Sequence, residues 1–198
     1  MKTEWKKIDT KDKKIEALVT TYNYDKDMKI IGKLYFQWKN LNDAIKKIST
    51  RGINLPEAIS ENAFCLFFPE CMRVNKLKKG KCSFDVINFK TGTRIQIKAS
   101  SIEEDLTSFG PRSEWDELYF LDFSKGDGSF FVYKIEQEWI YGHNINKNQT
   151  FEAQQQQGRR PRFSITKDII KIKKLKPIKE CRLPNIGILE MIRLNIYK

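Results

Sequence analysis

The chain has 198 residues, of which 40% are hydrophobic, and its Lys and Arg residues outnumber Asp and Glu by 37 to 25. This composition supplies one sizeable core and excludes a disordered chain. No apolar run approaches the roughly 18 residues of a membrane helix, and the amino terminus lacks the apolar segment of a signal peptide. We therefore expect a cytoplasmic protein, most simply a single domain (1–198), with no membrane partner.

The net charge of +12 is concentrated near the carboxyl terminus. From Gly158 to Lys198 there are 12 basic and 3 acidic residues, a net charge of +9. Neutralising phosphates releases counterions, so such a segment predicts a polyanionic partner. The alternative is a generally lysine-rich composition, but the clustering favours a partner that carries phosphates.

Cysteine and histidine exclude an ordinary zinc site. The four cysteines form no C-x-x-C pair, and His143 is the single histidine. We expect reduced, buried thiols at Cys65, Cys71, Cys82 and Cys181. A nuclease with a histidine-based metal finger is disfavoured, because one histidine cannot be both general base and ligand, and His143 is expected in a loop.

The first 50 residues predict a helical arm. Residues 1 to about 28 are charged and weakly patterned, which indicates a short helix or a loose arm. From Ile30 onward, apolar residues recur at steps of three and four and predict an amphipathic helix that ends at Ser49–Gly52. Its expected buried stripe is Ile30, Leu34, Trp38, Leu41, Ile45 and Ile48.

A second helix is predicted to begin at Pro56, a residue suited to a first helical turn. Its expected buried stripe is Ile59, Ala63, Leu66 and Phe67. Glu57 and Glu61 share one edge a turn apart, and this like-charged spacing favours a nearby cation. The alternative is that both are solvent-facing helix formers. The segment Lys76–Lys81 is expected to be a basic turn.

Strands follow, and they define the fold class. Runs rich in β-branched and aromatic residues flank Thr91–Gly92 and predict a hairpin. Leu118–Leu121 and Phe130–Ile135 predict two further strands. With helices before and after, we expect an α/β protein with a mixed central sheet of about four to five strands, a catalytic core at 54–135 and a basic part at 150–198 that contacts DNA.

The hairpin brings functional groups together. If Phe89 pairs with Arg94, Asp85 lies opposite Lys98. Side chains alternate along a strand, so Asp85, Gln96 and Lys98 are expected on one face.

This set suits metal-assisted hydrolysis of a phosphodiester. Mg²⁺ prefers oxygen ligands, which Asp85, the side chain of Gln96 and the main-chain carbonyl of Ile97 could supply. The metal would lower the pKa of a bound water, while Lys98 would orient that water or neutralise the developing anion.

At these residues the sequence resembles the PD-(D/E)xK nuclease superfamily, specifically its type II restriction endonucleases. Ser83-Phe84-Asp85, ten intervening residues and Gln96-Ile97-Lys98 carry the resemblance, which covers about 60 to 135. It implies a restriction-endonuclease-like fold with Asp85 as the metal-binding acid and Lys98 as the catalytic lysine. Glu61 matches a helix acid that many members carry and becomes a further catalytic residue and metal ligand.

Two residues depart from the motif. Phe84 replaces the proline, and Gln96 replaces the second acid, as in the Mrr-like nucleases. The loss of one carboxylate makes Glu61 more necessary. The alternative reading is a basic nucleic-acid-binding protein without catalysis, in which the pairing of Asp85 with Lys98 is structural.

An exposed loop is expected at Gln154–Phe163, and it supplies candidate base-reading groups. Arginine and glutamine side chains make paired hydrogen bonds to guanine and adenine edges. A homodimer is expected, because a two-fold axis matches a palindromic site and supplies one active site per strand. The candidate DNA-binding residues are Gln157, Arg159, Arg160, Arg162, Arg112 and Ser113.

Overall fold

The computed structural model describes residues 1–111 and 114–186 of the chain. Its central element is an eight-stranded sheet in the order β1-β2-β3-β4-β5-β7-β8-β12. The only parallel neighbours in it are β5 and β7, so the sheet is mixed. The strands are β1 (Lys2–Asp9), β2 (Lys14–Thr21), β3 (Cys71–Leu77), β4 (Val86–Asn88), β5 (Thr93–Ser100), β7 (Glu117–Asp122), β8 (Ser129–Ile135) and β12 (Lys179–Arg182).

The predicted α/β class is confirmed, but the expected sheet of four to five strands is wrong. The hairpin strands, β7 and β8 were anticipated, whereas β1, β2, β3 and β12 were not. Residues 2–21 form a hairpin rather than a short helix or loose arm, with a turn in which the Thr10 N–H donates to the Lys13 carbonyl at 2.8 Å. Lys76 and Leu77 belong to β3, so the basic turn begins only at Lys78.

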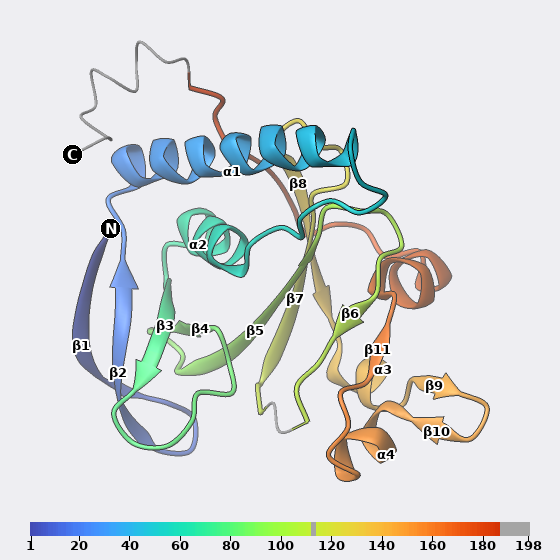
Figure 1. Cartoon of the computed structure of the whole chain (residues 1–198). Helices are drawn as coiled ribbons and strands as arrows, with labels where there is room; N and C mark the ends of the chain where they lie inside the picture. Colours follow the sequence, from blue (N-terminus) through green and yellow to red (C-terminus); the bar gives the residue numbers. More distant parts are fainter. Residues whose placement is uncertain (112–113, 187–198) are drawn as a thin grey trace.

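Two helices cover one face of the sheet, with α1 (Tyr24–Lys46) lying across α2 (Glu57–Phe67) in Figure 1. Both helices were predicted. The buried stripe of α1 differs from the expected one, however, because Leu34 and Leu41 are exposed. The helix instead buries a stripe that includes Met28, Ile31, Tyr35, Trp38 and Asn42.

A second core cluster lies under a set of short elements, drawn at the lower right of Figure 1. Phe109, Phe151 and Phe163 meet there, with ring centroids 5.0 to 6.2 Å apart. The short elements are β6 (Thr107–Ser108), α3 (Gln137–Tyr141), β9 (Asn144–Asn146), β10 (Gln149–Thr150), α4 (Phe151–Gln156), β11 (Arg162–Phe163) and a π-helical segment (Thr166–Lys171).

Three of the four cysteines are buried, as expected, but Cys82 is exposed; all four are free thiols. In the part of the chain that the structure describes, no helix is long and apolar enough to cross a membrane.

One ion pair fixes the start of β5 against the start of β7. The Arg94 guanidinium donates to Asp116 through Nε at 3.2 Å and Nη2 at 2.8 Å, and the Arg94 N–H donates to the same carboxylate at 2.7 Å. Both side chains are about 15% exposed, so water screens the pair only in part. Three hydrogen bonds therefore set the register of the parallel strands.

We expect Asp116→Ala to destabilise the fold by about 1 to 3 kcal/mol, because it leaves charged and main-chain donors without their acceptor. Urea unfolding followed by circular dichroism measures this. The matched control is Asp9→Ala, whose carboxylate is 75% exposed and pairs with Lys14 at 3.5 Å. The control should change stability by less than about 0.5 kcal/mol. Equal effects of the two substitutions would contradict the assignment.

Candidate active site

The turn between β4 and β5 sets the position of Asp85. Asn88 pairs with Thr93, and the side chain of Asn88 accepts hydrogen bonds from the N–H groups of Lys90 and Thr91. Gly92 completes the turn in the left-handed region, with φ of +69°, where glycine carries no steric penalty. Phe89 to Gly92 thus form the loop.

This turn corrects the predicted register. Phe89 does not pair with Arg94; instead Val86 pairs with Ile95. The Asp85 N–H donates to the Ile95 carbonyl at 3.0 Å, so Asp85 lies next to Ile95 and Gln96 rather than opposite Lys98. The predicted position is wrong by two residues along β5, because the last pair before the turn is Asn88 with Thr93, one residue earlier on each strand than expected.

The Asp85 carboxylate lies at the point where β4 ends and β5 continues. β4 pairs only with the first residues of β5, and beyond them the Ile97 N–H donates to Asp85 Oδ2 at 2.8 Å. The Gln96 amide nitrogen donates to the same oxygen and lies 3.5 Å from the Ile97 carbonyl oxygen. Asp85, Gln96 and Ile97, which we expected to lie together, therefore do so around this carboxylate.

Glu61 reaches the same site from α2. Its side chain is buried, and the Arg73 guanidinium of β3 donates to Glu61 Oε2 at 2.5 Å. Burial, then the charge of Asp85, raises the pKa of Glu61 to about 7, although Arg73 opposes the rise. Glu57, one turn earlier on α2, is exposed. The cation that the Glu57 and Glu61 spacing favoured is therefore Arg73.

Asp85 also has a raised pKa. Burial raises it to about 6, while the hydrogen bond from Ile97 and the charge of Lys98 oppose the rise. Glu61 is buried and Asp85 is half-buried, and the charge of Asp85 raises the proton affinity of Glu61. Carboxyls placed in this way are suited to a cation, which offsets both charges.

The donor set fits a hard divalent ion. Within the described residues, no group of three or more His, Cys, Asp and Glu side chains could hold a metal. The site instead combines the Asp85 and Glu61 carboxylates with two neutral oxygens, those of the Gln96 amide and the Ile97 main chain. The Gln96 amide nitrogen already lies between Asp85 and the Ile97 carbonyl. Rotating the amide by 180° exchanges its nitrogen and oxygen and directs Oε1 between these two groups.

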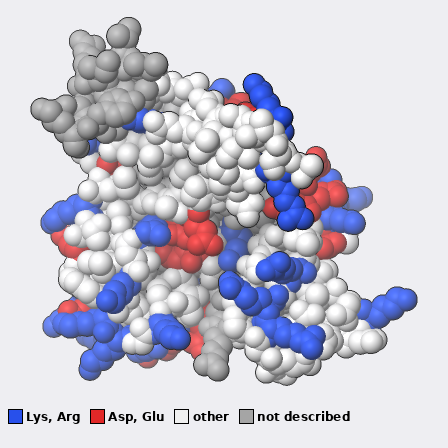
Figure 2. All heavy atoms as spheres, viewed as in Figure 1, with Lys and Arg blue, Asp and Glu red and all other residues white. Residues whose placement is uncertain are grey.

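Lys98 and Ile97 line a groove of about 390 Å³. Glu57 and Ser60 of α2 form one wall, and Thr107 and Ser108 of β6 form the other. Figure 2 shows acidic atoms gathered beside a hollow on this face, with Lys and Arg on both sides.

The predicted base-reading residues that the structure describes lie on β11 and on the segment before it, and β11 pairs with β6, which lines the groove. Arg162 of β11 pairs with Ser108 of β6, and Gln157, Arg159 and Arg160 are exposed. Arg159 donates to the Gln149 side chain at 3.4 Å, which in turn donates to Gln157 at 3.1 Å.

The predicted exposed loop at Gln154–Phe163 is wrong at both ends: residues 154–156 belong to α4 and Gln154 is buried, while Arg162–Phe163 form β11 and Phe163 is buried. Arg112 and Ser113 lie outside the described residues.

Sequence reasoning missed Arg73. The segment Cys71–Val74 reads as apolar with one charge, and nothing local links that charge to α2. The available signal was the spacing of Glu57 and Glu61, which predicts a nearby cation but does not identify the residue that supplies it.

Comparison with known proteins identifies the family. Residues 23–172 match the Bsp6I restriction endonuclease family. The chain is 38% identical over 162 residues to the type II restriction enzyme Bsp6I from Bacillus sp. (strain RFL6), which covers 80% of this chain and 90% of that enzyme. No solved structure matches. The predicted type II restriction endonuclease is confirmed: the chain belongs to the Bsp6I restriction endonuclease family.

Proposed function

We propose that this restriction endonuclease hydrolyses phosphodiester bonds in both strands of double-stranded DNA at a short specific sequence, with Mg²⁺ as its divalent metal. The observation that carries the proposal is that the charge of Asp85 acts on the buried Glu61 carboxyl, while the charge of Lys98, which lines the groove, acts on Asp85. Asp85, Glu61, the Gln96 side chain and the Ile97 carbonyl would hold the ion. Bound Mg²⁺ supplies a more acidic water and offsets charge on the phosphate.

The protein's own groups then have distinct roles in the mechanism. The Ile97 N–H fixes the Asp85 carboxylate, and Arg73 fixes that of Glu61. Lys98 donates to the attacking water or to a non-bridging phosphate oxygen and stabilises the added negative charge in the transition state. The oxygen of the water forms the new bond to phosphorus and gives up one proton to solvent, while the bond from phosphorus to the leaving oxygen breaks and that oxygen takes up a proton from solvent.

The basic carboxyl-terminal part supplies DNA affinity and base reading. Arg159, Arg160 and Arg162 with Gln157 lie on the side of the groove that β6 and β11 form. A homodimer would present one such site to each strand of a palindrome. A cytoplasmic location would give the enzyme access to incoming DNA.

Lys98→Ala should lower the cleavage rate by about 100-fold or more, the usual cost of losing one preorganised transition-state donor. The assay follows plasmid DNA with Mg²⁺ or with EDTA, and a gel shift in EDTA measures binding. Lys14→Ala is the control, because Lys14 is 86% exposed on the β1–β2 hairpin. Wild-type protein that leaves plasmids of diverse sequence uncut while binding them would favour the non-catalytic nucleic-acid-binding alternative.

Gln96→Glu should lower the Mg²⁺ concentration needed for half-maximal cleavage, because a third carboxylate adds charge to the ion site. The same substitution should lower the thermal midpoint in EDTA, since the new carboxylate replaces a donor to Asp85 with a like charge. Gln96→Leu, of similar size and without an oxygen, should raise the Mg²⁺ requirement. If neither variant shifts that requirement, Gln96 does not contact the ion.

The raised pKa values predict the pH dependence of stability without metal. The pKa is about 7 for Glu61 and about 6 for Asp85, both above the usual carboxyl range, so the native state binds these protons more tightly than the unfolded chain. Protonation of these two carboxyls contributes fully to the free energy of unfolding below about pH 4, and this contribution is lost as the pH rises through 6 and 7.

Asp85→Asn removes the titration of the Asp85 carboxyl. The free energy of unfolding of this variant, relative to that of the wild type, should therefore rise between pH 5 and pH 8 in EDTA. Urea midpoints at both pH values measure this. A constant difference would show that Asp85 keeps an ordinary pKa. Saturating Mg²⁺ should reverse the order at pH 8, since only wild type gains the binding energy.

A further inference from the structure

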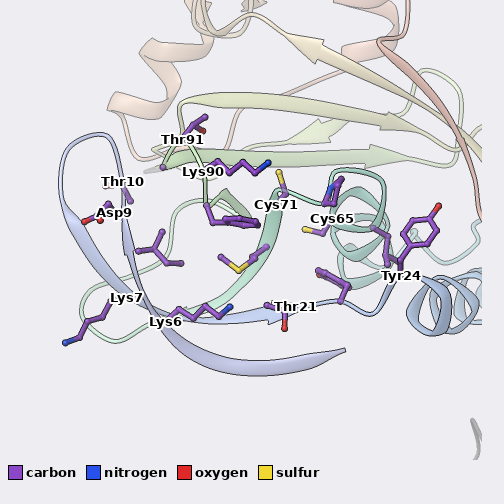
Figure 3. Close-up of a pocket in the computed structure, with 17 residues that line it drawn as sticks. Lys6, Lys7, Asp9, Thr10, Thr21, Tyr24, Cys65, Cys71, Lys90 and Thr91 are labelled. Carbon is purple, nitrogen blue, oxygen red and sulfur yellow. The ribbon is translucent and has the colours of Figure 1, made fainter.

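A second hollow, of about 670 Å³, lies between the β1–β2 hairpin and the β4–β5 turn (Figure 3). It shares no lining residue with the groove at Lys98. Its size falls within the range of about 300 to 1,000 Å³ that is typical of small-molecule sites. The restriction activity assigns nothing to this hollow.

Its floor is apolar and its mouth carries aromatic rings. Ile8, Leu66 and Met72 are buried and form the floor together with Cys65 and Cys71. Phe89 is 46% exposed and Tyr24 is 56% exposed, both at the lining. Exposed rings beside an apolar floor suit a planar ligand.

Cations line the same hollow from opposite walls. In Figure 3, the Lys90 ammonium extends toward Cys71 and the Lys6 side chain extends toward Thr21 on the other side of the hollow, whereas Lys7 points away. Lys6 pairs with Glu4 at 3.1 Å, and Lys90 makes no ion pair with the described residues. The one acidic lining residue, Asp9, pairs with Lys14 at 3.5 Å. The lining is therefore suited to an anion.

The β4–β5 turn closes one end of the hollow. A Cβ at Gly92 would lie 2.5 Å from the Asp9 carbonyl oxygen, so the turn and the hairpin touch through their main chains. A continuous polynucleotide could not run through a hollow closed in this way. A small ligand with a single anionic end fits it better.

We propose that this hollow binds a nucleoside monophosphate. The base lies over the apolar floor against Phe89, and the phosphate lies between the ammonium groups of Lys6 and Lys90. Charge-assisted hydrogen bonds to phosphate supply orientation, and the buried ring supplies apolar contact area.

Isothermal titration of the full-length protein with adenosine monophosphate tests the proposal, with adenosine and inorganic phosphate as separate ligands. We expect the monophosphate to bind more tightly than either fragment. Lys6→Gln and Lys90→Gln should each weaken it by about fivefold, the upper end for an exposed ion pair. Phe89→Leu should weaken it as well.

Lys7→Gln is the matched control, because Lys7 lies next to Lys6 on β1 and points away from the hollow. It should leave the affinity unchanged, as should Lys98→Ala, which tests binding at the groove. Thermal midpoints equal to wild type establish that the variants fold. No binding at millimolar ligand, or binding that Lys98→Ala weakens and Lys90→Gln does not, overturns the proposal. DNA cleavage does not enter this test, so the outcome is independent of the proposed catalytic mechanism.

Discussion

The Asp85 carboxylate accepts a main-chain hydrogen bond that a neighbouring strand would otherwise accept. β4 ends its pairing at Ile95, so the Ile97 N–H at the edge of β5 needs another acceptor, and Asp85 Oδ2 lies 2.8 Å from it. This hydrogen bond fixes one carboxylate oxygen of Asp85. The Ile97 carbonyl lies at the same edge of β5, beyond the end of β4. The positions of Gln96 and Lys98 relative to Asp85 in the proposed ion site depend on that short strand.

The two carboxyls of the site face two cations, and this explains how a glutamine can stand at position 96. The Asp85 and Glu61 carboxyls face the cations of Lys98 and Arg73. The Gln96 amide donates to Asp85, which an ionised carboxylate could not do. An acid at this position would add a third like charge to a buried cluster, at a cost that only a bound cation offsets.

Local pattern predicted the elements that bury most apolar surface. α2 and the strands at Leu118–Leu121 and Phe130–Ile135 follow from their apolar runs, and Asp85 follows from its spacing to Lys98. The β1–β2 hairpin was missed because its strands carry many charges, as suits a hairpin at the sheet edge. The buried stripe of α1 was missed because Tyr35 and Asn42 stand in it, while Leu34 and Leu41 face solvent.

Long-range contacts decided the rest of the site. No periodicity in α2 could pair Glu61 with Arg73, twelve residues along the chain and on a strand not predicted. The hairpin register was decided by the Asn88 side chain, which accepts hydrogen bonds inside the turn. Turn chemistry of this kind moves a strand by two residues without changing its apolar pattern, so the pattern alone could not detect it.

Lys98 connects the catalytic residues to the basic carboxyl-terminal part. Its ammonium lies 5.5 Å from the centre of the Phe109 ring, and that ring stacks on Phe163, 5.7 Å away. Phe109 also donates its N–H to the Pro161 carbonyl at 3.1 Å, directly between Arg160 and Arg162. Contacts of those arginines with DNA would therefore act on the segment against which Lys98 packs. A break in the β6–β11 pairing would move Lys98, the proposed catalytic lysine, together with the basic segment. The motif residues of the hairpin therefore do not form the whole of the proposed site by themselves.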